Sequence, residues 1–82
     1  MYFVYVIQNE MKEIYIGYTT DLKRRYQEHN QNKSFHTKNH QWELVYYEAY
    51  RHKQDAIERE RKLKQHGQSK RWLRERIKRS LQ

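Results

Sequence analysis

Three stretches of the chain carry apolar side chains with the spacing of β-strands. Residues 2–8 are apolar on both alternating sets of positions, which is typical of a strand covered on both faces and central in its sheet. Residues 14–18 and 42–50 are similarly rich in β-branched and aromatic residues. Residues 9–13 are polar and short enough for a hairpin loop, so we expect the first two strands to pair antiparallel. Alternation in the third strand predicts one face made of Trp42, Leu44, Tyr46, Glu48 and Tyr50.

The spacing of apolar residues becomes helical directly after the second strand. Thr19, Thr20 and Asp21 supply side-chain oxygens suited to a helix N-cap, so we predict a helix from near Thr20 to residues 30–32. Residues 33–41 are polar and have no period, which indicates a loop.

Two further helices are predicted in the last third of the chain. One spans residues 53–65 and is expected to end at Gly67 in the left-handed conformation. Ser69 is expected to cap the other, in which Leu73, Ile77 and Leu81 recur every four residues beside Trp72. The predicted order is strand, strand, helix, strand, helix, helix, which is the order of an α+β fold.

Length and composition limit the class of protein. The chain has 82 residues, and we expect residues 1–82 to form one domain. Aromatic residues make up 15% of the chain, whereas disordered chains contain few. The absence of cysteine excludes disulfides and cysteine-based zinc sites. Because no signal peptide or long apolar run is present, we expect a cytoplasmic protein with no membrane partner.

The formal charge of +8 is concentrated in the second part of the chain. Residues 1–50 contain six basic and six acidic side chains, whereas residues 51–82 contain twelve basic and four acidic ones. A neutral half joined to a cationic half favours a polyanionic partner, most often nucleic acid, over a basic surface that only aids solubility.

Candidate site residues lie at the end of the second strand and in the helix after it. Tyr5 and Tyr15 lie on paired strands, so each can bring a hydroxyl group to one cleft. Arg25 and His29 are four residues apart and therefore share one helix face. The other tyrosines of the third strand, Tyr46, Tyr47 and Tyr50, are interpreted as packing residues. The remaining histidines lack metal-ligand spacing and are interpreted as loop or helix-end residues: His36, His40, His52 and His66.

One carboxylate lies on the packing face of the helix predicted over residues 53–65. At about 100° per residue, Glu60 falls within the apolar stripe of that helix, whereas Glu58 faces water. A carboxylate in that position must be paired, hydrogen-bonded or bound to a metal ion. A salt bridge to Arg25 or Lys64 and a metal site both satisfy this requirement, and the sequence leaves both open.

These residues resemble the GIY-YIG nuclease superfamily, in particular its small stand-alone bacterial members. The first signature corresponds to Phe3-Val4-Tyr5 and the second to Tyr15-Ile16-Gly17, and the helix arginine and histidine of the family match Arg25 and His29. The metal-binding glutamate of the family matches Glu60. The resemblance implies a three-stranded antiparallel sheet flanked by helices, in the order β-β-α-β-α-α.

The resemblance also implies a metal-dependent nuclease. Glu60 would hold Mg²⁺ or Mn²⁺, Arg25 would clamp a phosphate oxygen, and Tyr5 would be the general base, helped by Tyr15 or His29. The expected substrate is DNA, with RNA as the alternative, and the excinucleases within the superfamily suggest DNA repair. A partner protein is a further expectation, because the chain has no room for a targeting domain. The side chains expected to contact phosphates are Arg24, Lys62, Lys64, Lys70, Arg71 and Arg74.

Two other functions are compatible with the sequence. The first is a non-catalytic nucleic-acid-binding module on the same fold, because many nucleases of the family use a late asparagine and none follows Asn39 here. Phe3 and Val4 also replace the glycine and isoleucine of the first signature. The second is an interaction module whose basic helices bind an acidic protein.

Overall fold

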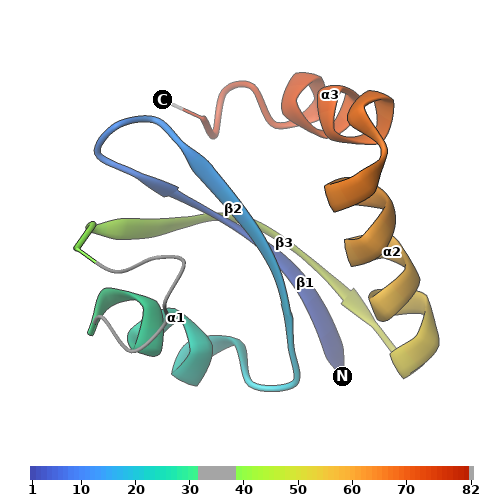
Figure 1. The fold of residues 1–82 in the computed structure, drawn as a ribbon. Coiled ribbons are helices and arrows are strands. Elements are labelled where there is room, and N and C mark those ends of the chain that lie inside the picture. Colours follow the sequence, from blue (N-terminus) through green and yellow to red (C-terminus); the bar gives the residue numbers. More distant parts are fainter. Residues whose placement is uncertain (32–38, 82) are drawn as a thin grey trace.

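The three predicted strands form one antiparallel sheet in the computed structural model, which describes residues 1–31 and 39–81. They are β1 (Tyr2–Asn9), β2 (Ile14–Thr19) and β3 (Trp42–Tyr50), in the spatial order β2-β1-β3 (Figure 1). The first strand is central, as predicted, since it pairs with β2 along one edge and with β3 along the other. Both of its faces are covered as well. Its four innermost residues are buried: Val4, Tyr5, Val6 and Ile7.

Helices cover both faces of the sheet, so each face has its own apolar cluster (Figure 1). The helix α1 (Leu22–Asn30) packs on the face that carries Tyr5 and Ile7. The opposite face, which carries Val4 and Val6, is covered from the C-terminal part of the chain. There α2 (Lys53–Gln65) and α3 (Gly67–Arg76) contribute the buried residues Ala56, Leu63 and Leu73. The predicted α+β fold and its element order are confirmed.

A β-bulge changes which residues of β3 share a face. Val6 pairs with Tyr46 but Ile7 pairs with Leu44, so Val45 is the extra residue of the bulge. Trp42 and Leu44 therefore pack on the α1 face, whereas Tyr46 packs on the α2–α3 face. The prediction that the even-numbered residues from Trp42 to Tyr50 share one face was wrong, because one inserted residue reverses the alternation.

The first helix begins where its capping residue is placed. The Asp21 side chain accepts a hydrogen bond from the Arg24 N–H at 3.1 Å, and the helix starts at Leu22 instead of near Thr20. The Asp21 N–H in turn donates to the Thr19 hydroxyl at 3.1 Å. Most of the loop predicted over residues 33–41 lies outside the described residues.

The junction of α2 and α3 differs from the prediction. His66 joins the two helices in an extended conformation, with φ −110° and ψ 106°, and none of the described glycines has a positive φ. Gly67 therefore begins α3 and does not end α2, and Ser69 lies inside α3 instead of capping it. An extended linker residue places α3 at an angle to α2, as Figure 1 shows. No helix in the described part of the chain is long and apolar enough to span a bilayer.

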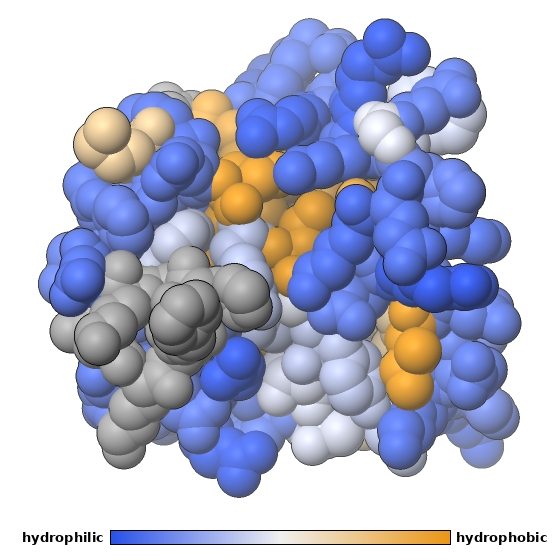
Figure 2. All heavy atoms as spheres, in the orientation of Figure 1, coloured by the Kyte–Doolittle hydropathy of each residue, from blue (hydrophilic) through white to orange (hydrophobic). Residues whose placement is uncertain are grey.

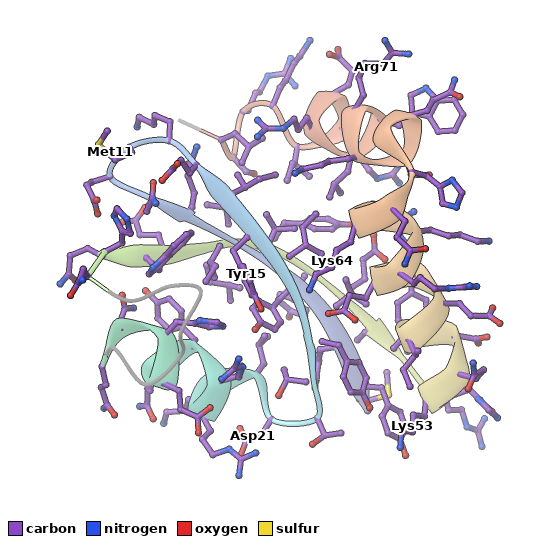
Figure 3. All side chains as sticks on the ribbon, in the orientation of Figure 1. Met11, Tyr15, Asp21, Lys53, Lys64 and Arg71 are labelled. Carbon is purple, nitrogen blue, oxygen red and sulfur yellow. The ribbon has the colours of Figure 1, made fainter. Side chains whose placement is uncertain are left out.

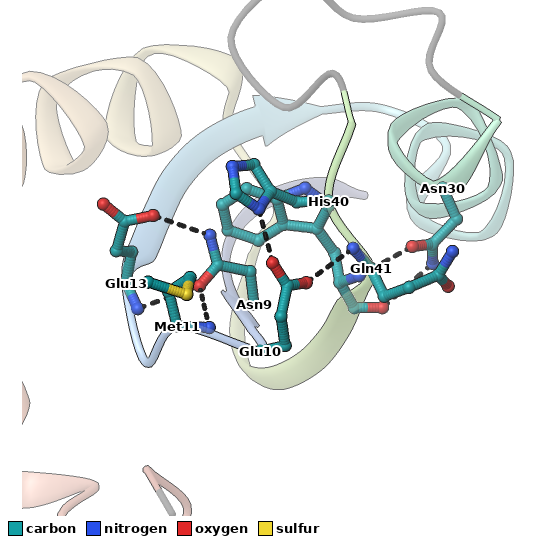
Figure 4. Close-up of polar contacts among 8 residues, drawn as sticks. Asn9, Glu10, Met11, Glu13, Asn30, His40 and Gln41 are labelled. Carbon is teal, nitrogen blue, oxygen red and sulfur yellow. Dashed lines mark hydrogen bonds and ion pairs between the residues drawn. The ribbon is translucent and has the colours of Figure 1, made fainter.

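Polar side chains fasten the β1–β2 turn and the start of β3 (Figure 4). The Asn9 side chain accepts hydrogen bonds from the N–H groups of Met11 at 2.9 Å and Glu13 at 3.0 Å. Glu10 binds His40 and accepts from the Gln41 N–H at 2.9 Å. The hydrogen bond with His40 is the main reason why the pKa of Glu10 falls to about 2.

The end of α1 is tied to the same strand. Asn30 accepts from the Trp42 N–H at 2.7 Å and donates to the Trp42 carbonyl at 2.9 Å. The Tyr26 hydroxyl donates to that carbonyl at 2.8 Å. Because these bonds satisfy the backbone of a buried residue, they fix α1 against the sheet.

A second polar cluster fixes α2 to β3. Arg59 donates two hydrogen bonds to the carboxylate of Glu48, at 2.9 and 3.0 Å. Tyr46 donates to the same carboxylate at 2.7 Å, and Tyr50 also donates to it. Burial raises the pKa of Glu48, but these hydrogen bonds outweigh burial and hold the pKa below its usual range. Tyr46 and Tyr50 thus have a polar role besides the packing predicted for them.

Gly17 creates the space that Tyr5 occupies. The two residues are cross-strand neighbours, and a Cβ atom on Gly17 would lie 2.3 Å from the Tyr5 hydroxyl oxygen and 2.4 Å from Cζ. The Tyr5 ring is buried on the sheet, so it has little room to move away. Only glycine at position 17 permits this placement of the phenol.

Gly17→Ala is therefore expected to destabilise the protein by about 1–3 kcal/mol, the usual cost of forcing an extra methyl group into a packed core. Urea unfolding monitored by circular dichroism measures this loss. Gly67→Ala is the matched control, because a Cβ atom there meets nothing within 4 Å. That control should be neutral or stabilising, since alanine favours a helix. Equal stability of the two variants would contradict the steric account of Gly17.

Candidate active site

Three aromatic rings from different elements meet on the α1 face of the sheet. Tyr5 comes from β1, Tyr15 from the edge strand β2 and His29 from the last turn of α1. The imidazole lies next to both phenols, with ring centroids 5.6 Å from Tyr5 and 5.2 Å from Tyr15. A hydrogen bond of 2.7 Å joins the Tyr5 hydroxyl to His29 Nε2. Tyr15 and His29 were both expected to help Tyr5, and His29 is the one that forms a hydrogen bond with the Tyr5 hydroxyl.

Burial keeps this hydrogen-bonded pair uncharged. His29 is fully buried, which together with the nearby Arg25 charge lowers its pKa from 6.5 to about 4. Burial also raises the pKa of Tyr5 from 10.0 to about 12, although the positive charge of Arg25 opposes this rise. Near neutral pH the pair is therefore a phenol and a neutral imidazole joined by one hydrogen bond.

Arg25 brings a permanent positive charge to the same place. It lies one helical turn before His29, and its charge acts on the pKa values of both His29 and Tyr5. Arg25 Nη1 lies 3.1 Å from Glu28 Oε1, and 30% of the Arg25 side chain is exposed to solvent. A guanidinium has five N–H donors, so one contact to a neighbouring carboxylate leaves donors for a ligand.

Glu60, the carboxylate predicted to hold a metal ion, approaches this site from α2, on the other side of the edge strand β2. Glu60 Oε2 lies 3.3 Å from Lys64 Nζ, and Lys64 Nζ lies 5.2 Å from the centre of the Tyr15 ring. Figure 3 shows Lys64 extending from α2 toward β2, where Tyr15 lies. The negative charge of Glu60 contributes to the raised pKa of Tyr5. Of the two ion pairs that the sequence left open, the one with Lys64 forms, whereas Arg25 pairs with Glu28.

The donor set suits a hard, hydrated cation. Among residues 1–31 and 39–81, no three histidine, aspartate or glutamate side chains gather into a closed metal site. Glu60 keeps 24% of its side chain exposed, so its carboxylate is accessible from solvent. Mg²⁺ is commonly bound by one or two carboxylates together with waters and substrate phosphates, so a single accessible carboxylate fits it.

The residues predicted to contact phosphates do not form one group. Lys64 lies beside the candidate site, whereas Arg71 projects from α3 away from the sheet (Figure 3). Lys70 is partly buried, and the others are exposed: Arg24, Lys62, Lys64, Arg71 and Arg74.

The remaining histidines have structural positions, apart from His36, which lies outside the described residues. His52 accepts a hydrogen bond from the Gln54 N–H at 3.1 Å and so caps α2. His40 binds Glu10, and His66 joins two helices. The interpretation of these three as loop or helix-end residues is therefore confirmed.

Two site features escaped the sequence analysis. The first is the space that Gly17 leaves for the Tyr5 phenol. Its signal was available, because a glycine inside a strand often marks a close approach, and a hairpin over residues 9–13 sets Gly17 opposite Tyr5. The second is the position of Lys64 over the Tyr15 ring. That contact crosses the sheet edge, so only the packing of α2 reveals it.

Comparisons with known proteins show which family the chain belongs to. A model of the GIY-YIG catalytic domain matches residues 1–75. A UPF0213 protein of Haloquadratum walsbyi is 30% identical over 71 residues, which are 84% of this chain and 80% of that protein. A UPF0213 protein of Streptococcus agalactiae is 37% identical over 65 residues, 77% of this chain and 74% of the relative. No solved structure matches significantly.

The family match covers every residue of the candidate site, from Tyr5 on β1 to Glu60 on α2. GIY-YIG domains are endonuclease domains that generally use divalent metal ions, and the relatives are small chains that this chain largely covers. The chain therefore belongs to the GIY-YIG family.

Proposed function

We propose that this protein is a metal-dependent endonuclease that hydrolyses phosphodiester bonds of DNA. The observation that supports this proposal most directly is the 2.7 Å hydrogen bond between Tyr5 and His29, beside the charge of Arg25. Such a pair can accept and pass on a proton at a fixed position, which hydrolysis by an activated water requires. Glu60 supplies the accessible carboxylate nearby.

Tyr5 is the proposed general base. Its oxygen takes a proton from the attacking water while its own proton moves to His29 Nε2, so the number of protons on the phenol stays unchanged. In the resting protein the pKa values of about 12 for Tyr5 and about 4 for His29 oppose this transfer. Glu60 would hold a divalent ion, whose positive charge would favour loss of the proton from the attacking water and would polarise the phosphate.

Arg25 is the proposed phosphate clamp. Its planar guanidinium matches the non-bridging oxygens of a phosphodiester and retains its charge at any relevant pH. Because Arg25 is on the same helix face as His29, a clamped phosphate lies next to the Tyr5–His29 pair. Exposed basic side chains on α1, α2 and α3 add affinity for the backbone without reading sequence.

A non-catalytic nucleic-acid-binding module is the second candidate. The raised pKa of Tyr5 favours it, because a phenol held neutral by burial is a poor base. The lack of an asparagine after Asn39 favours it as well. Binding that persists in a chelator, without cleavage of single-stranded, branched, nicked or RNA substrates in Mg²⁺ or Mn²⁺, would select this second function.

Loss of the acidic or the basic site residue is expected to abolish cleavage. Glu60→Gln and Arg25→Ala should each lower the rate of plasmid nicking in Mg²⁺ by roughly 10²–10³-fold, the usual effect of removing one group that stabilises transition-state charge. Glu58→Gln and Lys23→Ala are matched controls on the same two helices, because both native side chains are exposed. The controls should nick at the rate of the parent protein. If Glu60→Gln and Arg25→Ala nick at that rate too, the site assignment is wrong.

The neutral state of His29 predicts a pH-dependent stability. The folded pKa of about 4 lies below the ordinary 6.5, so the unfolded chain binds the proton first as the pH falls. The contribution of neutral His29 to the free energy of unfolding is therefore complete above pH 6.5 and is lost as the pH falls toward 4. Between pH 7 and pH 5 this loss is about 2 kcal/mol, at 1.36 kcal/mol per pKa unit.

Urea unfolding at these two pH values measures the difference. His29→Gln should remove most of the pH dependence in this range, whereas His66→Gln, at the exposed junction of α2 and α3, should retain it. An unchanged pH dependence in His29→Gln would show that other groups cause it.

A further inference from the structure

Trp72 is an exposed tryptophan in a cationic part of the surface. Its side chain is 63% exposed on α3, although the next residue, Leu73, is buried in the core. The sequence pattern places Trp72 beside the apolar stripe of this helix, whereas in the structure its side chain faces solvent. Tryptophan is a frequent anchor of binding surfaces, because its large flat ring packs on a ligand while its N–H can donate a hydrogen bond.

A cleft adjoins this indole at the junction of α2 and α3. It has a volume of about 290 Å³ and is lined by Trp72 together with Lys62, His66, Gln68 and Ser69. Lys62 contributes a positively charged side chain, and the first turn of α3 carries no acidic residue. The segment after residue 50 has twelve basic and four acidic side chains, so the surroundings of the cleft are cationic as well. The side of α2 and α3 that Figure 2 presents is mainly hydrophilic.

The cleft is separate from the candidate active site. At about 100° per residue, Lys62 lies about 160° around α2 from Glu60. Lys64, by contrast, faces Tyr15 across the sheet edge. Arg76 follows Trp72 by one helical turn and lines a different cavity together with Arg59. A ligand on Trp72 therefore occupies the flank of α2 away from Glu60.

The chemistry of this surface selects one occupant. An indole face stacks on any nucleobase, and an adjacent lysine binds the phosphate that follows the base. In a duplex each base is already stacked between its neighbours, so its face is not available to a side chain. We propose that Trp72, Lys62 and His66 form a second binding surface, which holds an unpaired nucleotide of a DNA or RNA strand. This inference rests on the proposed function only in taking nucleic acid as the ligand.

Indole fluorescence tests the proposal directly. The chain has two tryptophans, and Trp42 is only 5% exposed, so quenching by an added ligand reports on Trp72. We expect a short oligothymidylate, added in EDTA, to quench the fluorescence strongly and a short mixed-sequence duplex to quench it little. The fluorescence of Glu60→Gln should be quenched by oligothymidylate as strongly as that of the parent protein, because Glu60 lies on the other flank of α2. This variant separates a failure of catalysis from a failure of the second surface.

Variants of the surface give the second readout. Trp72→Ala should weaken oligothymidylate binding roughly tenfold or more, measured by fluorescence anisotropy of a labelled strand, whereas Trp72→Phe should retain most of the affinity. Lys62→Ala should reduce the slope of log affinity against log salt by about one. Met11→Ala is the matched control, since Met11 is 67% exposed on the β1–β2 turn. Trp72→Ala removes an exposed side chain, so circular dichroism should show an unchanged fold.

Two results would overturn the proposal. One is unchanged strand affinity in Trp72→Ala, which would show that the indole does not contact the nucleotide. The other is evidence for a ligand different from a single strand. It would be quenching by the duplex as strong as by the single strand, or quenching by an acidic protein when neither nucleic acid quenches. Either form of the second result would assign the cleft to a different partner.

Discussion

The hydrogen bond between Tyr5 and His29 is the contact on which packing and proposed chemistry both depend. It joins the central strand to the last turn of α1, and both side chains are buried. The phenol lies there because Gly17 on the neighbouring strand has no side chain. A residue without a side chain thus sets the position of the proposed general base. The hydrogen bonds between Asn30 and the Trp42 backbone hold the same end of the helix against the sheet.

Burial makes this pair stable and also makes it chemically inert without additional charge. It raises the pKa of Tyr5 and lowers that of His29, so both are neutral in the resting protein. Arg25 opposes the rise of the Tyr5 pKa, whereas Glu60 adds to it. Positive charge bound at Glu60 would reverse that contribution, which explains physically why a proposed metal site belongs beside the tyrosine. The Arg59–Glu48 hydrogen bonds fasten α2 to β3, and so they help to hold Glu60 near the tyrosine.

Local pattern was sufficient for most of the secondary structure. The β3 and α2 bounds, the Asp21 cap and the central position of β1 all follow from period and capping chemistry, which act over a few residues. The half-buried position of Glu60 on α2 was predictable as well, because the direction of a side chain on a helix depends on its spacing from apolar neighbours. The close approach of Tyr5 and His29 was expected only as a shared site, since their contact depends on how α1 meets the sheet.

The sequence by itself determined which elements form and in what order, and it named the residues of the candidate site. The tertiary structure decided that the bulge at Val45 splits the faces of β3, that Gly67 begins a helix and that Trp72 faces solvent. It also decided that Glu60 pairs with Lys64. Each of these depends on the register and angle between elements distant in the chain, which side-chain periodicity does not encode.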